Sequence, residues 1–400
     1  MIHRRFIGLM MLIAAALVEA STVQAADMAT LQQLYDGTML PDVAIETLSH
    51  TERLLPVRVV HRGGPARVLP RRTAPFPPIH FMYEGRSLDL YDYLTINRVA
   101  GLLVLKNGEI ALEHYQLGIT PRSRWASFSM AKSITSTLVG VALADGAIAS
   151  LDDPISRYVP ALRGGAYEGV NIRQVLTMSS GVCWNETYTD PASDRRKVLE
   201  LQIAGQSGAV LRYMNSLARC SAAGSVWNYN TGETYVLGAV VEGATHKPAT
   251  RYLSDAIWSR AGMEQDATWW VEQHQGMTWA GTGLGATLRD YGRFGLLVAD
   301  GGRLDGRPIV PEGWFSQAGA PQSVGGKTEN YGYMWWIPDQ TDPMHAGAFE
   351  AVGIFGQYLY INPREHLVIV VLGAHSKPNH TACCEINDNA FFSAVASALH

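Results

Sequence analysis

The chain has 400 residues, of which 47% are hydrophobic and 17% are charged. This composition is ordinary for a globular protein and excludes a mainly disordered, collagen-like or coiled-coil chain. The formal net charge is −4, so there is no excess of positive charge to hold a polyanion, and nucleic acid is not expected as a partner. At roughly 150 residues per domain, the length allows two or three domains or one large domain with an insertion.

The first 25 residues have the layout of a secretory signal peptide. Arg4 and Arg5 precede an apolar run from Phe6 to Val18, and a small-x-small cleavage signal ends at Ala25. The run is too short for a comfortable membrane span, and no later stretch reaches the ~18 apolar residues that a span needs. We therefore expect cleavage near Ala25–Ala26 and a secreted or periplasmic protein without a stable membrane anchor.

Residues 26–84 are predicted to form an N-terminal arm that leads into one catalytic unit over residues 85–400. Between Pro56 and Pro78, proline and arginine are frequent. Prolines at this density prevent a regular helix, so this part of the arm is expected to be extended and to cross the surface of the unit.

Strand signals occur at both ends of the catalytic unit. Residues 101–108 and 109–115 are strand-like runs around the turn signal Asn107-Gly108, and residues 356–362 and 367–372 form a second pair. Residues 387–399 are typical of an amphipathic helix, while helical periodicity and long loops dominate from about 150 to 285. The expected fold is therefore α/β (α+β): an antiparallel sheet built from both chain ends, flanked by helices, with an inserted, mostly helical region.

Four cysteines are present, at Cys183, Cys220, Cys383 and Cys384. In an oxidising compartment they allow three disulfide pairings, which the sequence does not separate. The spacing of the last two from His375 and His380 matches no standard zinc pattern. A disulfide or buried thiols are favoured over a metal site, and neither a metal nor a cofactor is expected.

Ser129 and Lys132 form a Ser-x-x-Lys motif. The run from Ile134 to Ala144 is apolar on nearly every face, which predicts a buried helix with this motif at its start. Residues at i and i+3 share one face, so the amine can reach the hydroxyl. A lysine serves as base to a serine only if its pKa is lowered, by burial or by neighbouring charge. The structural alternative is an N-cap serine beside a lysine that extends to solvent.

Several segments, in order, resemble the serine β-lactamase and penicillin-binding protein superfamily, which has a β-lactamase/transpeptidase-like fold. The resemblance is closest to its class C-like branch, which includes 6-aminohexanoate-dimer hydrolase and related esterases. It covers roughly residues 85–400, and is specific for the fold and a serine nucleophile more than for a substrate. The segments that carry it are residues 125–133, 146–154, 171–181, 227–238, 287–290, 331–336 and 353–357.

This resemblance implies roles for individual residues. Ser129 corresponds to the nucleophile, Lys132 to its base partner and Tyr229 to the tyrosine that exchanges protons with the serine and the leaving group. A lysine ammonium near Tyr229 favours its phenolate. Two backbone N–H groups are expected to form the oxyanion hole, one from Ser129 and one from the strand before Gly353, which counting assigns to Ala351.

Two departures from the family pattern bear on the substrate. Thr231 stands where relatives carry Asn in Tyr-x-Asn. The third motif, Lys-Thr-Gly or His-Thr-Gly in those relatives, is replaced by residues 348–350, with His345 upstream as a possible substitute. The basic residue of that motif binds the carboxylate of penicillins, so its absence favours an amidase or esterase.

The loop after residue 181 carries further candidates for substrate binding. In the resembling branch, a tyrosine and acidic side chains of this region contact the substrate and its amino end, which points to Tyr188, Glu186 and Asp190. A polar surface loop is the structural alternative for each of them. Arg289 and Asp290 are expected to form a helix cap or an ion pair rather than a catalytic pair.

The sequence thus predicts an exported serine hydrolase that cleaves a small amide or ester through a Ser129 acyl-enzyme. A D-alanyl-D-alanine carboxypeptidase or class C-like β-lactamase is the alternative within the same class. A non-catalytic binding or sensor protein on this fold is the alternative from another class. The natural substrate, the disulfide pairing and the oligomeric state stay open.

Overall fold

The computed structural model describes residues 31–273, 276–378 and 384–400. The predicted signal peptide and Cys383 lie outside the described residues. None of the helices in the described ranges is long and apolar enough to cross a bilayer.

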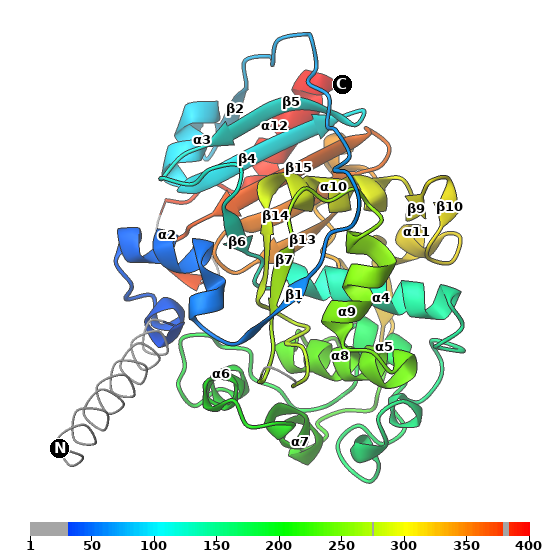
Figure 1. Ribbon diagram of the computed structural model, residues 1–400. Helices are drawn as coiled ribbons and strands as arrows, with labels where there is room; N and C mark the ends of the chain where they lie inside the picture. The colour runs from blue at the N-terminus through cyan, green and yellow to red at the C-terminus, as the bar shows by residue number, and fades with distance from the viewer. Residues whose placement is uncertain (1–30, 274–275, 379–383) are drawn as a thin grey trace, which may run out of the picture.

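The central layer is a five-stranded antiparallel sheet to which both ends of the chain contribute, as the sequence predicts (Figure 1). Its strands β15 and β4 pair directly, with Leu367 opposite Lys106. All residues of β14 and β15 are buried, so the sheet is covered on both faces. The order is β13 (Phe349–Gly353), β14 (Gln357–Asn362), β15 (Leu367–Gly373), β4 (Val99–Lys106) and β5 (Glu109–Tyr115).

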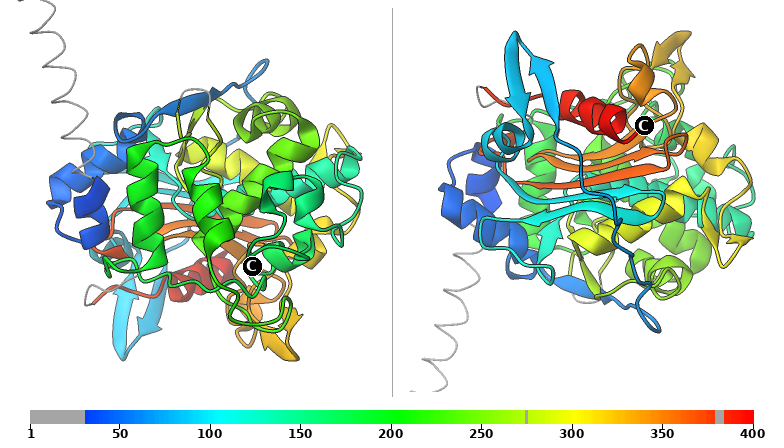
Figure 2. Two further views of the ribbon diagram at one scale, coloured as in Figure 1. Left: turned by 90° about the horizontal axis from the view of Figure 1, so that it is seen from below. Right: turned by 90° about the horizontal axis from the view of Figure 1, so that it is seen from above.

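Helices form a layer on each face of this sheet (Figure 2). α3 (Leu90–Ile96) and α12 (Asp388–Leu399) pack on one face. α4 (Met130–Ala144) and α10 (Leu288–Ala299) pack on the other. Alternate strand residues divide between the two faces, as the period of two requires. The predicted buried helix is confirmed as α4, in which residues 130–142 are all buried.

A second, four-stranded sheet was not anticipated from the sequence. Its order is β1 (Val57–Val60), β7 (Ala267–Trp270), β8 (Leu284–Thr287) and β6 (Arg124–Ala126). Each strand has only three or four residues, too few for alternation to stand out in the sequence. β1 belongs to the arm expected to be extended, and β6 leads directly toward α4.

Helices and loops make up the chain between β6 and β7. α8 (Thr231–Thr245) packs on α4, and α5, α6, α7 and α9 surround it. These four span Ile172–Leu176, Asp194–Ala204, Ala209–Ser216 and Ala249–Leu253. The remaining elements are α2 (Pro41–Ser49), η1 (Thr51–Arg53), β2 (His80–Tyr83), β3 (Arg86–Asp89), η2 (Ile155–Arg157), η3 (Pro160–Leu162), η4 (Ser254–Trp258), β9 (Arg303–Leu304), β10 (Arg307–Pro308), α11 (Trp314–Ala318), β11 (Gln322–Val324), β12 (Lys327–Glu329) and η5 (Pro343–His345).

Arg289 and Asp290 have the structural roles predicted for them. Arg289 forms an ion pair with Glu113 of β5. Asp290 accepts hydrogen bonds from the backbone N–H groups of Glu264 and Gln265, at 2.7 and 3.0 Å. Both residues therefore fix α10 to its surroundings.

α10 approaches the central sheet closely because it carries glycine at the contact. A Cβ placed on Gly295 would lie 2.5 Å from Val368 Cγ1 and 2.9 Å from Leu359 Cδ1. Both neighbours belong to buried strands and have little room to move.

We predict that Gly295→Ala lowers the free energy of unfolding by about 1–3 kcal/mol through overpacking, despite the better helix propensity of alanine. Urea denaturation measures this change. Gly64→Ala is the matched control, because a Cβ at Gly64 would meet nothing within 4 Å. Equal stability of the two variants would contradict the prediction.

Candidate active site

Ser129 lies at the N-cap of α4, immediately after a sharp turn from β6. The residue before it, Phe128, has φ of 41°, in the left-handed region that costs energy for any residue except glycine. Its ring packs edge-on against Phe355 at 4.8 Å between centroids and against Trp270 at 6.5 Å. These contacts hold the turn that presents Ser129 to a cavity.

Lys132 is buried one turn into α4 and contacts the serine directly. Its Nζ donates to Ser129 Oγ at 2.8 Å and to the carbonyl oxygen of Gly281 at 3.1 Å. Burial lowers the pKa of Lys132 to about 7, although the Glu186 carboxylate acts in the opposite direction. The amine is therefore neutral in a large fraction of molecules at neutral pH and can accept the proton of Ser129.

Tyr229 precedes α8 and meets the same serine from the other side. Its hydroxyl shares a hydrogen bond with the Ser129 side chain, and Lys132 Nζ lies 5.1 Å from its ring centroid. Burial raises the pKa of Tyr229 well above its usual value. The expectation that Tyr229 forms a phenolate is therefore wrong, because the loss of hydration on burial outweighs the effect of the nearby amine. Tyr229 stays a neutral phenol, and Lys132 is the group suited to act as base.

The strand register changes the residue expected in the oxyanion hole. Glu350 exchanges both backbone hydrogen bonds with Trp336, on the outer edge of β13. Backbone groups alternate in direction along an antiparallel strand, so Ala351 points inward to Leu359 of β14 and Val352 points to the outer edge. Ala351 is therefore not in the position expected for it, and Val352 offers its N–H instead.

Gly353 brings this edge of β13 close to the start of α4. A Cβ at Gly353 would lie 2.7 Å from the carbonyl oxygen of Ser127 and 2.4 Å from Gln357 Oε1. Only a residue without a side chain permits this approach. The N–H of Val352 and the N-terminus of α4 are therefore neighbours.

Glu186 connects the loop before α6 to the start of α8. Its carboxylate accepts hydrogen bonds from the Thr231 N–H, at 2.9 Å, from the Thr231 hydroxyl and from Trp184 Nε1. The Thr that replaces the family's Asn is thus a partner of Glu186. This arrangement places a carboxylate beside the Ser129, Lys132 and Tyr229 group.

The other three predicted binding residues lie in three different places, and among them Tyr188 lines the cavity whereas Asp190 and His345 do not. Tyr188 is buried and contributes to the cavity wall. Asp190 accepts from the Ala192 N–H at 2.9 Å and shapes its own loop instead. His345 is buried against Tyr360, at 3.0 Å from its hydroxyl, on the α12 side of the central sheet. It therefore does not replace the missing basic residue of the third motif.

The cavity at Ser129 has a volume of about 700 Å³. Glu186 is the one acidic side chain among the described lining residues, and none of them is basic. Trp336, whose ring centroid lies 5.3 Å from that of Tyr229 with the two rings tilted, forms part of the wall. The lining consists of Ser129, Glu186, Thr187, Tyr188, Thr189, Tyr229, Trp336, Val352, Gly353, Ile354 and Pro378. Within the described ranges, no group of three or more potential metal ligands occurs.

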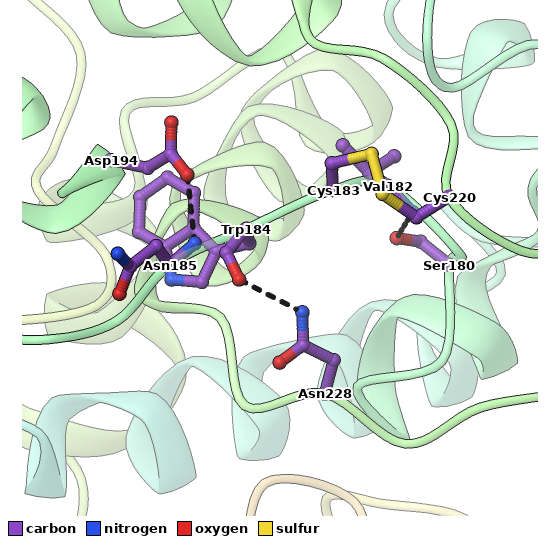
Figure 3. The surroundings of a disulfide bond; sticks show 8 residues. All are labelled: Ser180, Val182, Cys183, Trp184, Asn185, Asp194, Cys220 and Asn228. Atoms are coloured by element: carbon purple, nitrogen blue, oxygen red, sulfur yellow. Dashed lines mark hydrogen bonds between the residues drawn. A yellow bond between two sulfur atoms is a disulfide. The ribbon is translucent and has the colours of Figure 1, made fainter.

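A disulfide between Cys183 and Cys220 joins the two loops that supply Glu186 and Tyr229 (Figure 3). Beside it, Asn228 Nδ2 donates to the carbonyl oxygen of Trp184 at 3.2 Å. The structure thereby selects one cross-link among the pairings that the sequence left open. Both loops are held together within a few residues of the cavity.

The central sheet, the buried α4 and the Ser-x-x-Lys pair at its start define the serine hydrolase fold of β-lactamases. Residues 97–384 match the Beta-lactamase family, and the chain belongs to this family. The resemblance found in the sequence is therefore confirmed.

Relatives and solved structures agree with this assignment. The 6-aminohexanoate-dimer hydrolase of Paenarthrobacter ureafaciens is 30% identical over 343 residues, which cover 82% of this chain and 84% of that relative. A Bacillus anthracis structure provisionally assigned as a 6-aminohexanoate-dimer hydrolase matches with a TM-score of 0.73 and 24% identity, over 84% of this chain and 89% of its own. The D-alanine carboxypeptidase AmpC of Burkholderia cenocepacia matches with a TM-score of 0.54 and 17% identity, over 77% and 96%. The two structural matches show a shared fold.

We predict that the reaction of Ser129 with a fluorophosphonate accelerates with rising pH through about 7 and then levels off, because only the neutral Lys132 amine takes up the serine proton. Intact-mass spectrometry at a series of pH values measures the rate. Lys132→Ala is expected to slow the reaction by about 10²-fold or more and to abolish this rise. An unchanged profile in that variant would exclude Lys132 as the base.

We predict that loss of the Cys183–Cys220 cross-link by the double substitution to serine lowers the free energy of unfolding by about 2–4 kcal/mol. Urea denaturation of the oxidised wild type and the double variant checks this. The variant is also expected to raise KM for a hydrolysed ester more than it lowers kcat, because the cavity wall loosens while Ser129 and Lys132 stay on α4. An unaltered KM would show that the cross-link does not support the wall.

Proposed function

We propose that this protein is a serine hydrolase that cleaves an amide or ester bond through an acyl-enzyme on Ser129. The observation that carries the proposal is the buried Lys132 amine at 2.8 Å from Ser129 Oγ, at the wall of a cavity. Burial gives this amine a pKa near neutrality. A serine beside such a base is an activated nucleophile.

In the acylation step, Ser129 Oγ attacks the carbonyl carbon of the substrate and its proton passes to Lys132 Nζ. The negative charge on the carbonyl oxygen is held by the backbone N–H groups of Ser129 and Val352. The bond to the leaving nitrogen or oxygen then breaks. The leaving atom receives the proton from Lys132 through the Tyr229 hydroxyl, so Tyr229 relays a proton without becoming a stable anion.

Deacylation runs through the same groups in the opposite order. A water molecule gives its proton to the neutral Lys132 through Tyr229 and attacks the acyl carbon. The ester bond to Ser129 breaks, the carboxylic acid product forms, and Ser129 Oγ recovers a proton from Lys132. No metal or cofactor takes part in the proposed sequence.

The charge of the cavity supports a neutral or zwitterionic substrate. Its described lining holds a carboxylate, that of Glu186, and no cation that would bind the carboxylate of a penicillin or of a D-alanyl-D-alanine end. Glu350, in the segment that replaces the third motif, is buried and is not among the residues that line the cavity. The name of the Paenarthrobacter relative, a hydrolase of an aminohexanoate dimer, is in keeping with an amide substrate.

We also propose that the protein is exported to the periplasm or beyond. The signal-peptide pattern of residues 1–25 and the Cys183–Cys220 disulfide support this location, because disulfides persist in oxidising compartments. N-terminal sequencing of the protein purified from the producing cells, with the start expected at Ala26, tests this part of the proposal.

We predict that wild-type protein gains the mass of one fluorophosphonate adduct on Ser129, and that Ser129→Ala gains none. The wild type should also hydrolyse short chromogenic esters or amides, and Ser129→Ala should lose at least about 10³-fold of this activity. Rapid turnover of nitrocefin, or labelling by a fluorescent penicillin, would favour a β-lactamase or carboxypeptidase instead. If wild-type Ser129 takes no adduct, the hydrolase proposal fails and a binding or sensor role replaces it.

A further inference from the structure

Arg195, near the start of α6, is a buried cation that forms no direct ion pair with a carboxylate of the described residues, although the Glu186 carboxylate acts on it through space. Its side chain is only 1% exposed, and its guanidinium carbon lies 4.7 Å from the centroid of the Tyr35 ring. It also donates a hydrogen bond to the Tyr35 hydroxyl, while its Nη1 has no hydrogen-bond partner. A guanidinium stays charged in a protein, so this site holds a fixed positive charge away from water.

Tyr35 places this cation directly behind the wall of the cavity. It comes from the helical residues 31–36, and its ring lies 6.2 Å from the Tyr188 ring and 6.4 Å from the Phe128 ring. Tyr188 lines the cavity, and Phe128 forms the turn before the nucleophile. A segment from the N-terminal part of the chain therefore connects Arg195 with both sides of the site.

Arg195 and Glu186 act on Lys132 with opposite signs. Glu186 stabilises the ammonium form of Lys132, and Arg195 destabilises it, in addition to the larger effect of burial. The Glu186 carboxylate, which accepts hydrogen bonds from Thr231 at the start of α8, raises the pKa of the amine that has to act as a base. Arg195 supplies a counter-charge from the start of α6, where its backbone N–H donates to the carbonyl oxygen of Asn185, the residue before Glu186, at 3.1 Å.

The other elements packed against α4 direct their charged groups elsewhere. Glu233 of α8 is hydrogen-bonded to Ser180, and Glu350 of β13 faces Asn389. After α9, Asp255 forms ion pairs with two surface cations. The two charged groups that act on Lys132 are therefore Glu186, in the loop before α6, and Arg195, on α6 itself.

We propose that Arg195 is a positioning residue whose charge, held in place by Tyr35, offsets the Glu186 carboxylate and keeps Lys132 available as the base. This inference rests on the proposed hydrolase function. It adds the requirement that the N-terminal helical segment and α6 must be packed together for Ser129 to be reactive near neutral pH. Arg195 touches neither the substrate nor Ser129, so its effect is on the protonation of Lys132.

The pH dependence of Ser129 labelling by a fluorophosphonate tests this inference without knowledge of the natural substrate. In Arg195→Gln, the rise of the labelling rate with pH should move to higher pH, because the ammonium form of Lys132 is less disfavoured. We expect an approximately three- to tenfold lower rate on the acid side, with the rate at high pH within about twofold of wild type.

The neighbouring Arg196 offers a matched control. It lies on the same helix, pairs with Asp36 at 2.6 Å and donates to the Tyr188 carbonyl oxygen, but it is not among the charges that shift the pKa of Lys132. Arg196→Gln should therefore leave the pH dependence in place even if it loosens the loop. Thermal unfolding of each variant verifies that it is folded.

Two results would overturn the inference. One is a folded Arg195→Gln protein that is labelled at Ser129 with the wild-type pH dependence. If Arg195→Gln does not fold, Glu186→Gln takes its place: its rise should move to lower pH, and an unmoved rise is the second such result. Absence of labelling in the wild type at every pH would instead refute the hydrolase proposal itself.

Discussion

The enclosure of Lys132 is the constraint on which the arrangement of the site depends. An amine without contact to water loses most of the hydration that stabilises its charged form, so the protein holds a base where an exposed lysine would be an acid. This state requires that α4 is covered by its neighbours, and α8, α9, β13 and β14 pack against it. The packing of the sheets and helices around α4 thus keeps the Lys132 Nζ atom away from water.

The burial of Lys132 alone does not make a reactive serine, because the Ser129 side chain also has to reach the cavity from the start of a buried helix. The left-handed backbone at Phe128 and the absence of a side chain at Gly353 solve this problem. One turns Ser129 outward, and the other lets the edge of β13 come close to it. The strained backbone at Phe128 is tolerated because its ring packs against Trp270 and Phe355.

Much of this organisation could be predicted from the sequence, and the exceptions have a common cause. The central sheet, the buried helix and the Ser129–Lys132 spacing depend on local patterns and short motifs. Counting along the chain assigns the oxyanion-hole N–H to Ala351 rather than Val352, because the direction of an N–H depends on strand pairing, which counting does not reveal. Arg195 and Tyr35 belong to no recognisable motif, because the role proposed for them depends on a contact between segments far apart in the sequence.

The pairing of β4 with β15 has a consequence for how the protein is made. Strands from opposite ends of the chain must meet before the sheet exists, so the contacts that matter most have high sequence separation and form slowly. A nascent chain that has already emerged past Ser129 and Lys132 still lacks β13 and β15, and with them the edge that carries Val352. An unfinished chain therefore lacks the assembled edge of β13 that faces Ser129.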